Sequence, residues 1–142
     1  MRLLIDTNVF LEILLEREKK EEASNFIRLS CVKYNQLIAT SMSLRDIGYA
    51  VHRKYHETKK TKAIQLEVYQ LVSKIVDTTA DAAIESIYND VGDYEDSMQM
   101  IAAEEAMCDA IITFNKKDYE KSKVPAFTPQ EMIEIWEKQK RG

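Results

Sequence analysis

The sequence has 142 residues, a length that predicts one domain, residues 1–142, with a core of ordinary size. Hydrophobic residues make up 45% and charged residues 31% of the chain, and no apolar run approaches the roughly 20 residues that span a bilayer, which excludes a membrane protein. The formal net charge of −4 does not by itself favour binding to nucleic acid, whose phosphates attract basic surfaces.

Apolar residues follow two patterns along the chain, short runs typical of buried strands and a spacing of three to four residues typical of helices. In chain order, these patterns predict a strand at 3–7, a helix at 9–17, a charged turn at 16–22, a helix at 22–32, a strand at 37–40, helices at 41–55 and 58–75, a strand at 75–78, helices at 81–90 and 93–107, a strand at 109–115 and a helix from Pro129. Thr7 or Asn8 can cap the first helix, and Thr128 the last. Strands that alternate with helices indicate an α/β domain with a mainly parallel central sheet.

Four side chains could suggest zinc, but their context argues against it. Cys31 and Cys108 are isolated in apolar surroundings, so we expect both to be small core residues. His52 and His56 have the spacing of a zinc pair but lack the glutamate of an HExxH motif, so we expect an exposed helix end. The apolar run before Asp6 is too short for a secretory signal, and we expect a cytoplasmic protein.

Three of the predicted strands end in polar residues. Ligands of parallel sheets gather beyond the carboxyl ends of the strands, where Asp6, Asn115 and Asp118 would emerge. Asp96 would lie in the first turn of its helix, and Asp46 about one and a half turns into the helix that follows the second strand. The four aspartates are therefore candidates for one pocket.

A cluster of carboxylates needs a cation, because like charges raise one another's pKa values. Oxygen ligands without histidine or cysteine favour Mg²⁺ or Mn²⁺ over zinc. Such a site prepares the hydrolysis of a phosphodiester, and bound metal would also offset the negative net charge.

Two segments, MRLLIDTNVFLEILLER and DYEDSMQMIAAEEAMCDAIITFNKKDY, resemble the PIN domain, in the branch that includes VapC-type toxins of toxin–antitoxin pairs. The resemblance implies an α/β/α sandwich around a parallel sheet. It also implies a metal-dependent ribonuclease that uses three or four acidic residues.

Matched position by position, the family's acidic residues correspond to Asp6, Asp46, Asp96 and Asp118, which would be catalytic. Asp6, Asp96 and Asp118 would hold one or two Mg²⁺ or Mn²⁺ ions. Five further residues are expected to support these ligands from behind: Thr7, Asn8, Asp93, Thr113 and Asn115.

The chain departs from the family pattern at two places. Asp46 stands where glutamate is common, and its reach is one methylene group shorter, which leaves direct, water-mediated and purely electrostatic roles open. Met107 and Cys108 stand where relatives often have glycine before the last strand, a change that we expect to affect only a turn.

The expected partners are RNA, an antitoxin protein and a second copy of the chain in a homodimer. Basic residues beside the site, Arg45, Lys116 and Lys117, could form an RNA-binding rim that further residues extend: Arg53, Lys54, Lys59, Lys60 and Lys62. Ordinary solvated charges are an equally good interpretation of each of them.

Alternative functions remain open for this sequence. A PIN-like binding module with weak or no catalysis would be consistent with Asp46, and a metal-dependent phosphatase or DNA flap nuclease would use similar carboxylates. We expect one group of aromatic and sulfur-containing side chains to pack rather than to stack on bases: Tyr49, Tyr55, Met98, Met100 and Trp136.

Overall fold

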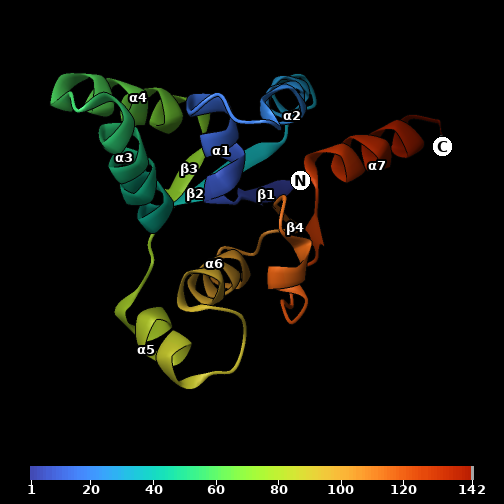
Figure 1. Ribbon diagram of the computed structural model, residues 1–142. Helices are drawn as coiled ribbons and strands as arrows, with labels where there is room; N and C mark the ends of the chain where they lie inside the picture. Colours follow the sequence, from blue (N-terminus) through green and yellow to red (C-terminus); the bar gives the residue numbers. More distant parts are fainter. Residues whose placement is uncertain (142) are drawn as a thin grey trace.

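A five-stranded parallel sheet forms the centre of the computed structural model, which describes residues 1–141. The strands are β1 (Arg2–Ile5), β2 (Gln36–Thr40), β3 (Lys74–Val76), β4 (Ala110–Ile112) and β5 (Ala126–Phe127). They lie in the order β3-β2-β1-β4-β5, so the first strand in the sequence occupies the middle of the sheet (Figure 1). Leu4 of β1 is in register with Ile38 of β2 on one side and with Ile111 of β4 on the other.

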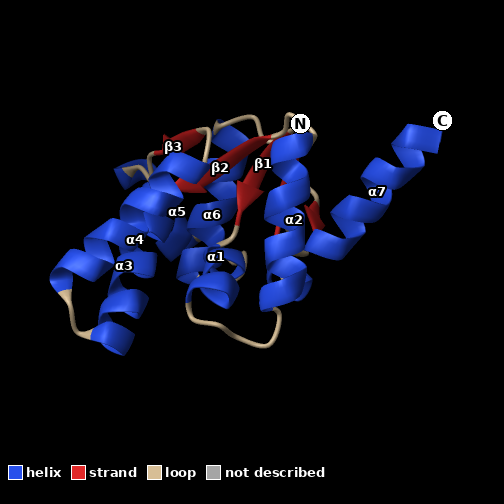
Figure 2. Ribbon diagram, turned by 90° about the horizontal axis from the view of Figure 1, so that it is seen from above, coloured by secondary structure: helices blue, strands red, loops and turns tan. Residues whose placement is uncertain are grey.

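Helices cover both faces of the sheet. They are α1 (Thr7–Leu14), α2 (Lys20–Val32), α3 (Ser41–Tyr55), α4 (Thr58–Leu71), α5 (Ala80–Tyr88), α6 (Tyr94–Glu105), α7 (Pro129–Arg141) and the short 3-10 helix η1 (Lys116–Tyr119). Residues of α1 to α4 share one core cluster with the sheet, and α5 and α6 lie below the sheet in Figure 1. Seen from above in Figure 2, α7 extends to the side of this arrangement.

The alternation of side chains along β1 separates the core into two parts. Leu3 and Ile5 point to the face covered by α1 to α4, where they pack with Phe26 and Ile47. Leu4 points to the opposite face, into a smaller cluster whose other members include Met100 of α6. This three-layer α/β/α arrangement confirms the predicted fold class.

Several helix boundaries match the predictions, because their signals are local. Helix α3 covers the predicted range, and the Thr40 hydroxyl accepts a hydrogen bond from Ser43 N–H at its start. Helix α7 begins at Pro129 as predicted, where Thr128 and Glu131 form a reciprocal capping box.

Other boundaries were wrong where tertiary contacts or charge decided the outcome. The helix predicted at 58–75 ends at Leu71, because the next residues join the sheet and Ser73 N–H donates to Leu37 O. The charged run at 16–22 is a turn only in part, since α2 already begins at Lys20 with acidic residues in its first turn. Thr7 and Asn8 do not cap α1 but lie inside it, and Asp6 occupies the N-cap position, although its side chain accepts no capping hydrogen bond.

The end of α6 shows what replaces the glycine of the family pattern. Met107 has a φ of 54°, in the left-handed region, and its N–H donates to Glu104 O while Cys108 N–H donates to Ala103 O. This is a Schellman motif with methionine at the position where glycine is usual. The expectation that only a turn is affected is consistent with this local geometry.

The two cysteines differ in their surroundings. Cys108 is buried, as predicted, but Cys31 is exposed on α2, so the expectation of a core residue was wrong there. His52 and His56 are exposed at the end of α3, as predicted. Among the helices of residues 1–141, none combines the length and the apolar composition needed to cross a bilayer.

Candidate functional site

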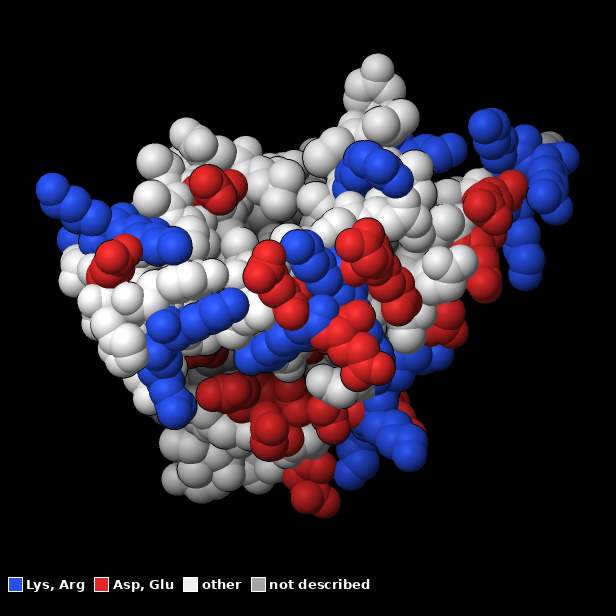
Figure 3. Space-filling view, turned by 45° about the horizontal axis from the view of Figure 1, so that its top comes forward, with Lys and Arg blue, Asp and Glu red and all other residues white. Residues whose placement is uncertain are grey.

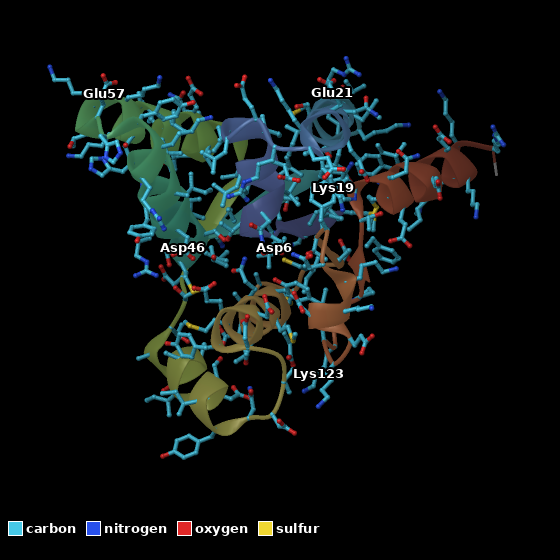
Figure 4. All side chains as sticks on the ribbon, in the orientation of Figure 1. Asp6, Lys19, Glu21, Asp46, Glu57 and Lys123 are labelled. Carbon is cyan, nitrogen blue, oxygen red and sulfur yellow. The ribbon has the colours of Figure 1, made fainter. Side chains whose placement is uncertain are left out.

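A pocket of about 250 Å³ opens where the carboxyl end of β1 meets α1, α3 and α6. Its lining consists of Asp6, Thr7, Asn8, Leu11, Met42, Asp46, Tyr49, Glu95, Asp96 and Gln99. Figure 4 shows Asp6 and Asp46 near the beginnings of α1 and α3, on the side of these helices that faces α6. The pocket therefore brings together three of the four predicted catalytic aspartates.

Asp6 is the most deeply buried carboxylate of the pocket, with 7% of its surface exposed. Its Oδ2 accepts a hydrogen bond of 2.8 Å from the Thr113 hydroxyl, which in turn accepts one from Asn115 N–H. Burial raises the pKa of Asp6 above its ordinary value of 3.8, and the hydrogen bond from Thr113 offsets only part of that effect. None of the ion pairs found in residues 1–141 involves Asp6.

Asp96 lies in the first turn of α6, as predicted, and is partly buried. The Asp93 carboxylate caps this helix by accepting a hydrogen bond of 2.8 Å from Asp96 N–H. Burial and the neighbouring charges of Asp93, Asp118 and Asp6 raise the pKa of Asp96 to about 7. The negative charge of this group is therefore poorly compensated in the protein alone.

Asp118 belongs to η1, is exposed and lies outside the pocket lining, but it is near enough for its charge to raise the pKa of Asp96. A close approach of two loops makes this possible, because Gly92 has a φ of +68° and a Cβ at this position would lie 3.2 Å from Asp118 O and 3.3 Å from Asp96 Cβ. Gly92 thus allows the chain before α6 to pass beside η1.

The α3 side of the pocket carries Asp46, whose carboxylate pairs with Arg45 at 2.9 Å. Glu95, the neighbour of Asp96 in α6, lines the same pocket and is not among the predicted site residues. Partial burial and the charges of Asp46 and Asp93 raise the pKa of Glu95 above 4.5. Glu95 is therefore a fourth acidic residue of the pocket lining, and its position next to Asp96 was the signal that could have identified it.

Sequence reasoning missed a chain of hydrogen bonds beneath the pocket. Gln99 accepts from the buried hydroxyl of Thr40 at 2.8 Å and donates to Ser43 Oγ at 3.0 Å. The hydroxyls of Ser43 and Thr7 lie 2.6 Å apart and share a further hydrogen bond. These contacts join α1, β2, α3 and α6, and they fix the elements that carry Asp6, Asp46 and Asp96.

Other predicted site residues lie away from the pocket lining. Thr113 is buried behind Asp6, whereas Asn115, Lys116 and Lys117 are exposed along the loop and η1. The Lys116 ammonium group pairs with Glu131 of α7 at 2.9 Å. The role of these residues toward RNA stays a prediction.

The aromatic and sulfur-containing side chains divide into two groups. Met98, Met100 and Trp136 are buried, and Tyr55 packs against the core, as expected. Tyr49 is 67% exposed at the pocket, so the expectation that it packs in the core was wrong.

The acidic residues fit a hard cation by their chemistry and charge. Within residues 1–141, no group of three or more His, Cys, Asp or Glu side chains is already arranged to hold a metal ion. The buried carboxylate of Asp6 and the raised pKa of Asp96 nevertheless leave negative charge that a divalent ion would neutralise. Oxygen donors of this kind suit Mg²⁺ or Mn²⁺, and binding would draw the carboxylates closer together.

An apolar groove lies on a different face of the protein, between α1, α2 and α4. It has a volume of about 570 Å³, and most of its surface comes from side chains such as Phe10, Ile27 and Leu71. Arg28 and Glu67 stand among these apolar residues. The groove contains none of the predicted catalytic residues.

Comparisons with known proteins agree with this fold. The family model described as PIN domain matches residues 2–117. The structure is similar to that of VapBC2 from Rickettsia felis bound to a DNA fragment from their promoter, with a TM-score of 0.64, 15% identity, and coverage of 90% of this chain and 98% of the other. It is also similar to VapC20 of Mycobacterium tuberculosis, a toxin that cleaves the sarcin–ricin loop, with a TM-score of 0.60, 13% identity, and coverage of 77% and 86%. No curated protein matches the chain.

Proposed function

Because the chain belongs to the PIN domain family, we propose that it is a divalent-metal-dependent endoribonuclease and the toxin of a toxin–antitoxin pair. One observation carries the proposal. The buried carboxylate of Asp6 and the partly buried Asp96 share a pocket at the carboxyl end of a parallel sheet. Keeping such groups charged and unpaired is costly unless a cation binds, so the arrangement favours a metal site over a purely structural one.

In this proposal Asp6, Asp96 and Asp118 hold the ion, either Mg²⁺ or Mn²⁺. When bound, the ion supplies a water molecule of lowered pKa and neutralises charge on the phosphate oxygens. Thr113 orients Asp6 through its hydrogen bond of 2.8 Å, and Asp93 fixes the first turn of α6 by capping it.

In the proposed enzyme, Asp46 and Glu95 attract the metal ion by their charge and do not serve as ligands. Both line the pocket, and their charges raise the affinity of the site for cations without requiring direct coordination. Arg45 pairs with Asp46, which places a guanidinium group at the rim of the pocket, where it can meet a phosphate of the RNA. We propose Lys116 and Lys117 as further contacts to the RNA backbone, with Lys116 exchanging Glu131 for phosphate.

The proposed partners are an antitoxin and a second copy of the chain. One similar structure is of VapBC2 bound to promoter DNA, which makes a protein partner of the antitoxin kind the natural proposal here. An antitoxin that inhibits the enzyme would cover the acidic pocket, and the apolar groove between α1, α2 and α4 offers a second surface to anchor it.

The proposal is tested by incubating the protein with mixed RNA in Mg²⁺, in Mn²⁺ and in EDTA. We expect cleavage that needs the ion and disappears in Asp6→Asn and in Asp96→Asn. Asp81→Asn, which changes an exposed aspartate in the first turn of α5, is the matched control and should cleave as the wild type does.

A second candidate function is a binding module without catalysis, favoured by the short side chain of Asp46 at a position where the family often has glutamate. The same assay separates the two functions. Metal binding measured by calorimetry without cleavage of any RNA would support the binding module, and Asp46→Glu would then be the variant to test for recovered activity.

A further inference from the structure

Tyr49 is an exposed residue that lines the acidic pocket. Its side chain is 67% exposed, and it shares the pocket lining with Asp6, Asp46 and Asp96. An exposed aromatic ring gains nothing from core packing, and its apolar faces are available to a ligand.

Tyr49 also belongs to a stripe along α3 that leads away from the pocket. Asp46, Tyr49 and Arg53 are spaced by three and four residues, so they lie on one face of the helix. The guanidinium carbon of Arg53 lies 5.9 Å from the centre of the Tyr49 ring, near the outer limit of a cation–π contact. Arg53 therefore covers the Tyr49 ring only loosely.

Beyond Arg53 the stripe reaches a group of basic residues at the α3–α4 hairpin. Its members are exposed: Arg53, Lys54, Lys59, Lys60 and Lys62. Figure 3 shows basic side chains on the left of the molecule, on the side of this hairpin, and a group of acidic side chains at the lower centre. Asp46, Tyr49 and Arg53 thus follow one another along α3, and the basic group continues from Arg53 into α4.

We infer that Tyr49 stacks on an unpaired base of the RNA beside the cleaved bond, while Arg53 and the hairpin contact the phosphates that follow. The inference rests on the proposed ribonuclease function and adds to it a residue that positions an unpaired part of the substrate. A base inside a duplex hides both of its faces, so stacking on a protein side chain requires that the base be unpaired. Stacking tolerates every base, so Tyr49 would position the strand without reading its sequence.

Binding is tested on an Asp96→Asn background, which keeps the RNA intact, in Mg²⁺ and with single-stranded RNA that carries 2-aminopurine at one position at a time. Stacking quenches this fluorescent base. We expect Tyr49→Leu to abolish the quenching at one position and to weaken binding about 5- to 10-fold, the lower part of the range for one stacked base. Tyr49→Phe keeps the ring and should behave as the parent protein does.

Tyr69 provides the matched control, because it is a tyrosine on α4 with 58% of its surface exposed and lies outside the pocket lining. Tyr69→Leu should leave both quenching and affinity unchanged. Equal quenching with and without the Tyr49 ring would overturn the inference, as would a loss of binding in Tyr49→Phe, tight binding of blunt duplex RNA, or no quenching at any position.

A separate measurement keeps this result apart from the proposed function. In the otherwise wild-type protein, an abasic nucleotide at the stacking position should slow metal-dependent cleavage, and Tyr49→Leu should remove that sensitivity. Cleavage that needs metal but is insensitive to Tyr49 and to the abasic site would refute the stacking role and leave the ribonuclease intact. Absence of any cleavage would refute the ribonuclease, while the fluorescence still decides whether Tyr49 stacks.

Discussion

Replacing Asp96 with asparagine should stabilise the metal-free protein at alkaline pH. Burial and the charges of Asp93, Asp118 and Asp6 raise the pKa of Asp96 from 3.8 to about 7. The folded protein therefore keeps this proton at pH values where the unfolded chain has lost it. The free energy of unfolding falls as the pH rises from about 4 to about 7, and it stays reduced above that range.

The two pKa values set the size of the effect. Their difference corresponds to roughly 4 kcal/mol, at 1.36 kcal/mol for each pH unit. Asp96 is only partly buried, and screening by solvent reduces the interaction, so we expect Asp96→Asn to gain about 1–2 kcal/mol at pH 8. In a chain of this length, that gain corresponds to an increase in Tm of about 2–8 °C.

The assay is urea unfolding followed by circular dichroism in EDTA, at about pH 4.5 and at pH 8. Asp81→Asn is again the control, since it removes an exposed acidic residue from the first turn of α5 and should lose no more than about 1 kcal/mol through the helix dipole. An equal gain from Asp96→Asn at both pH values, or the same gain from Asp81→Asn, would show that the crowding of charges around Asp96 is not the cause. Adding Mn²⁺ at pH 8 should stabilise the wild type more than Asp96→Asn.

Three further substitutions test local features by thermal unfolding. Met107→Gly should raise stability by about 1 kcal/mol, because glycine adopts the φ of 54° without strain, and an unchanged Tm would contradict this account of the turn. Gly92→Ala should lower stability by about 1–2 kcal/mol, since its methyl group would lie 3.2 Å from Asp118 O in a left-handed conformation, and a neutral result would mean that the loop can move away. Thr113→Val should cost about 1–3 kcal/mol at pH 8 and slow RNA cleavage, because the buried Asp6 loses its hydrogen bond, and a variant with unchanged stability and activity would refute the orienting role.

The parts of the fold that follow from neighbouring residues could be predicted from the sequence. Helix α3 has both a capping threonine and regular apolar spacing, and its predicted range is the observed one. Helix α4 was predicted too long, because the apolar spacing continues into residues that pair with β2 instead. The strand predicted at 75–78 overlaps β3 (Lys74–Val76), but the apolar spacing alone does not show where the helix ends before it.

The residues of the candidate site also fall into two groups, those that the local sequence predicts and those that only the tertiary structure brings together. Asp6 and Asp96 could be placed because one ends a strand and the other begins a helix. Ser43 and Gln99 could not, because their hydrogen bond joins residues 56 positions apart, on helices from opposite faces of the sheet. The exposure of Tyr49 likewise depends on how α3 and α6 meet across the pocket, which no periodicity along either helix specifies.

The central position of β1 has a consequence for synthesis in the cell. Strand β1 leaves the ribosome before β4, its second neighbour, and the hydrogen bond between Asp6 and Thr113 closes a separation of 107 residues. Closing contacts so distant along the chain is costly in entropy and slows folding. During translation, Asp6 therefore lacks the surroundings that orient it until Thr113 has emerged, and the pocket is completed only then.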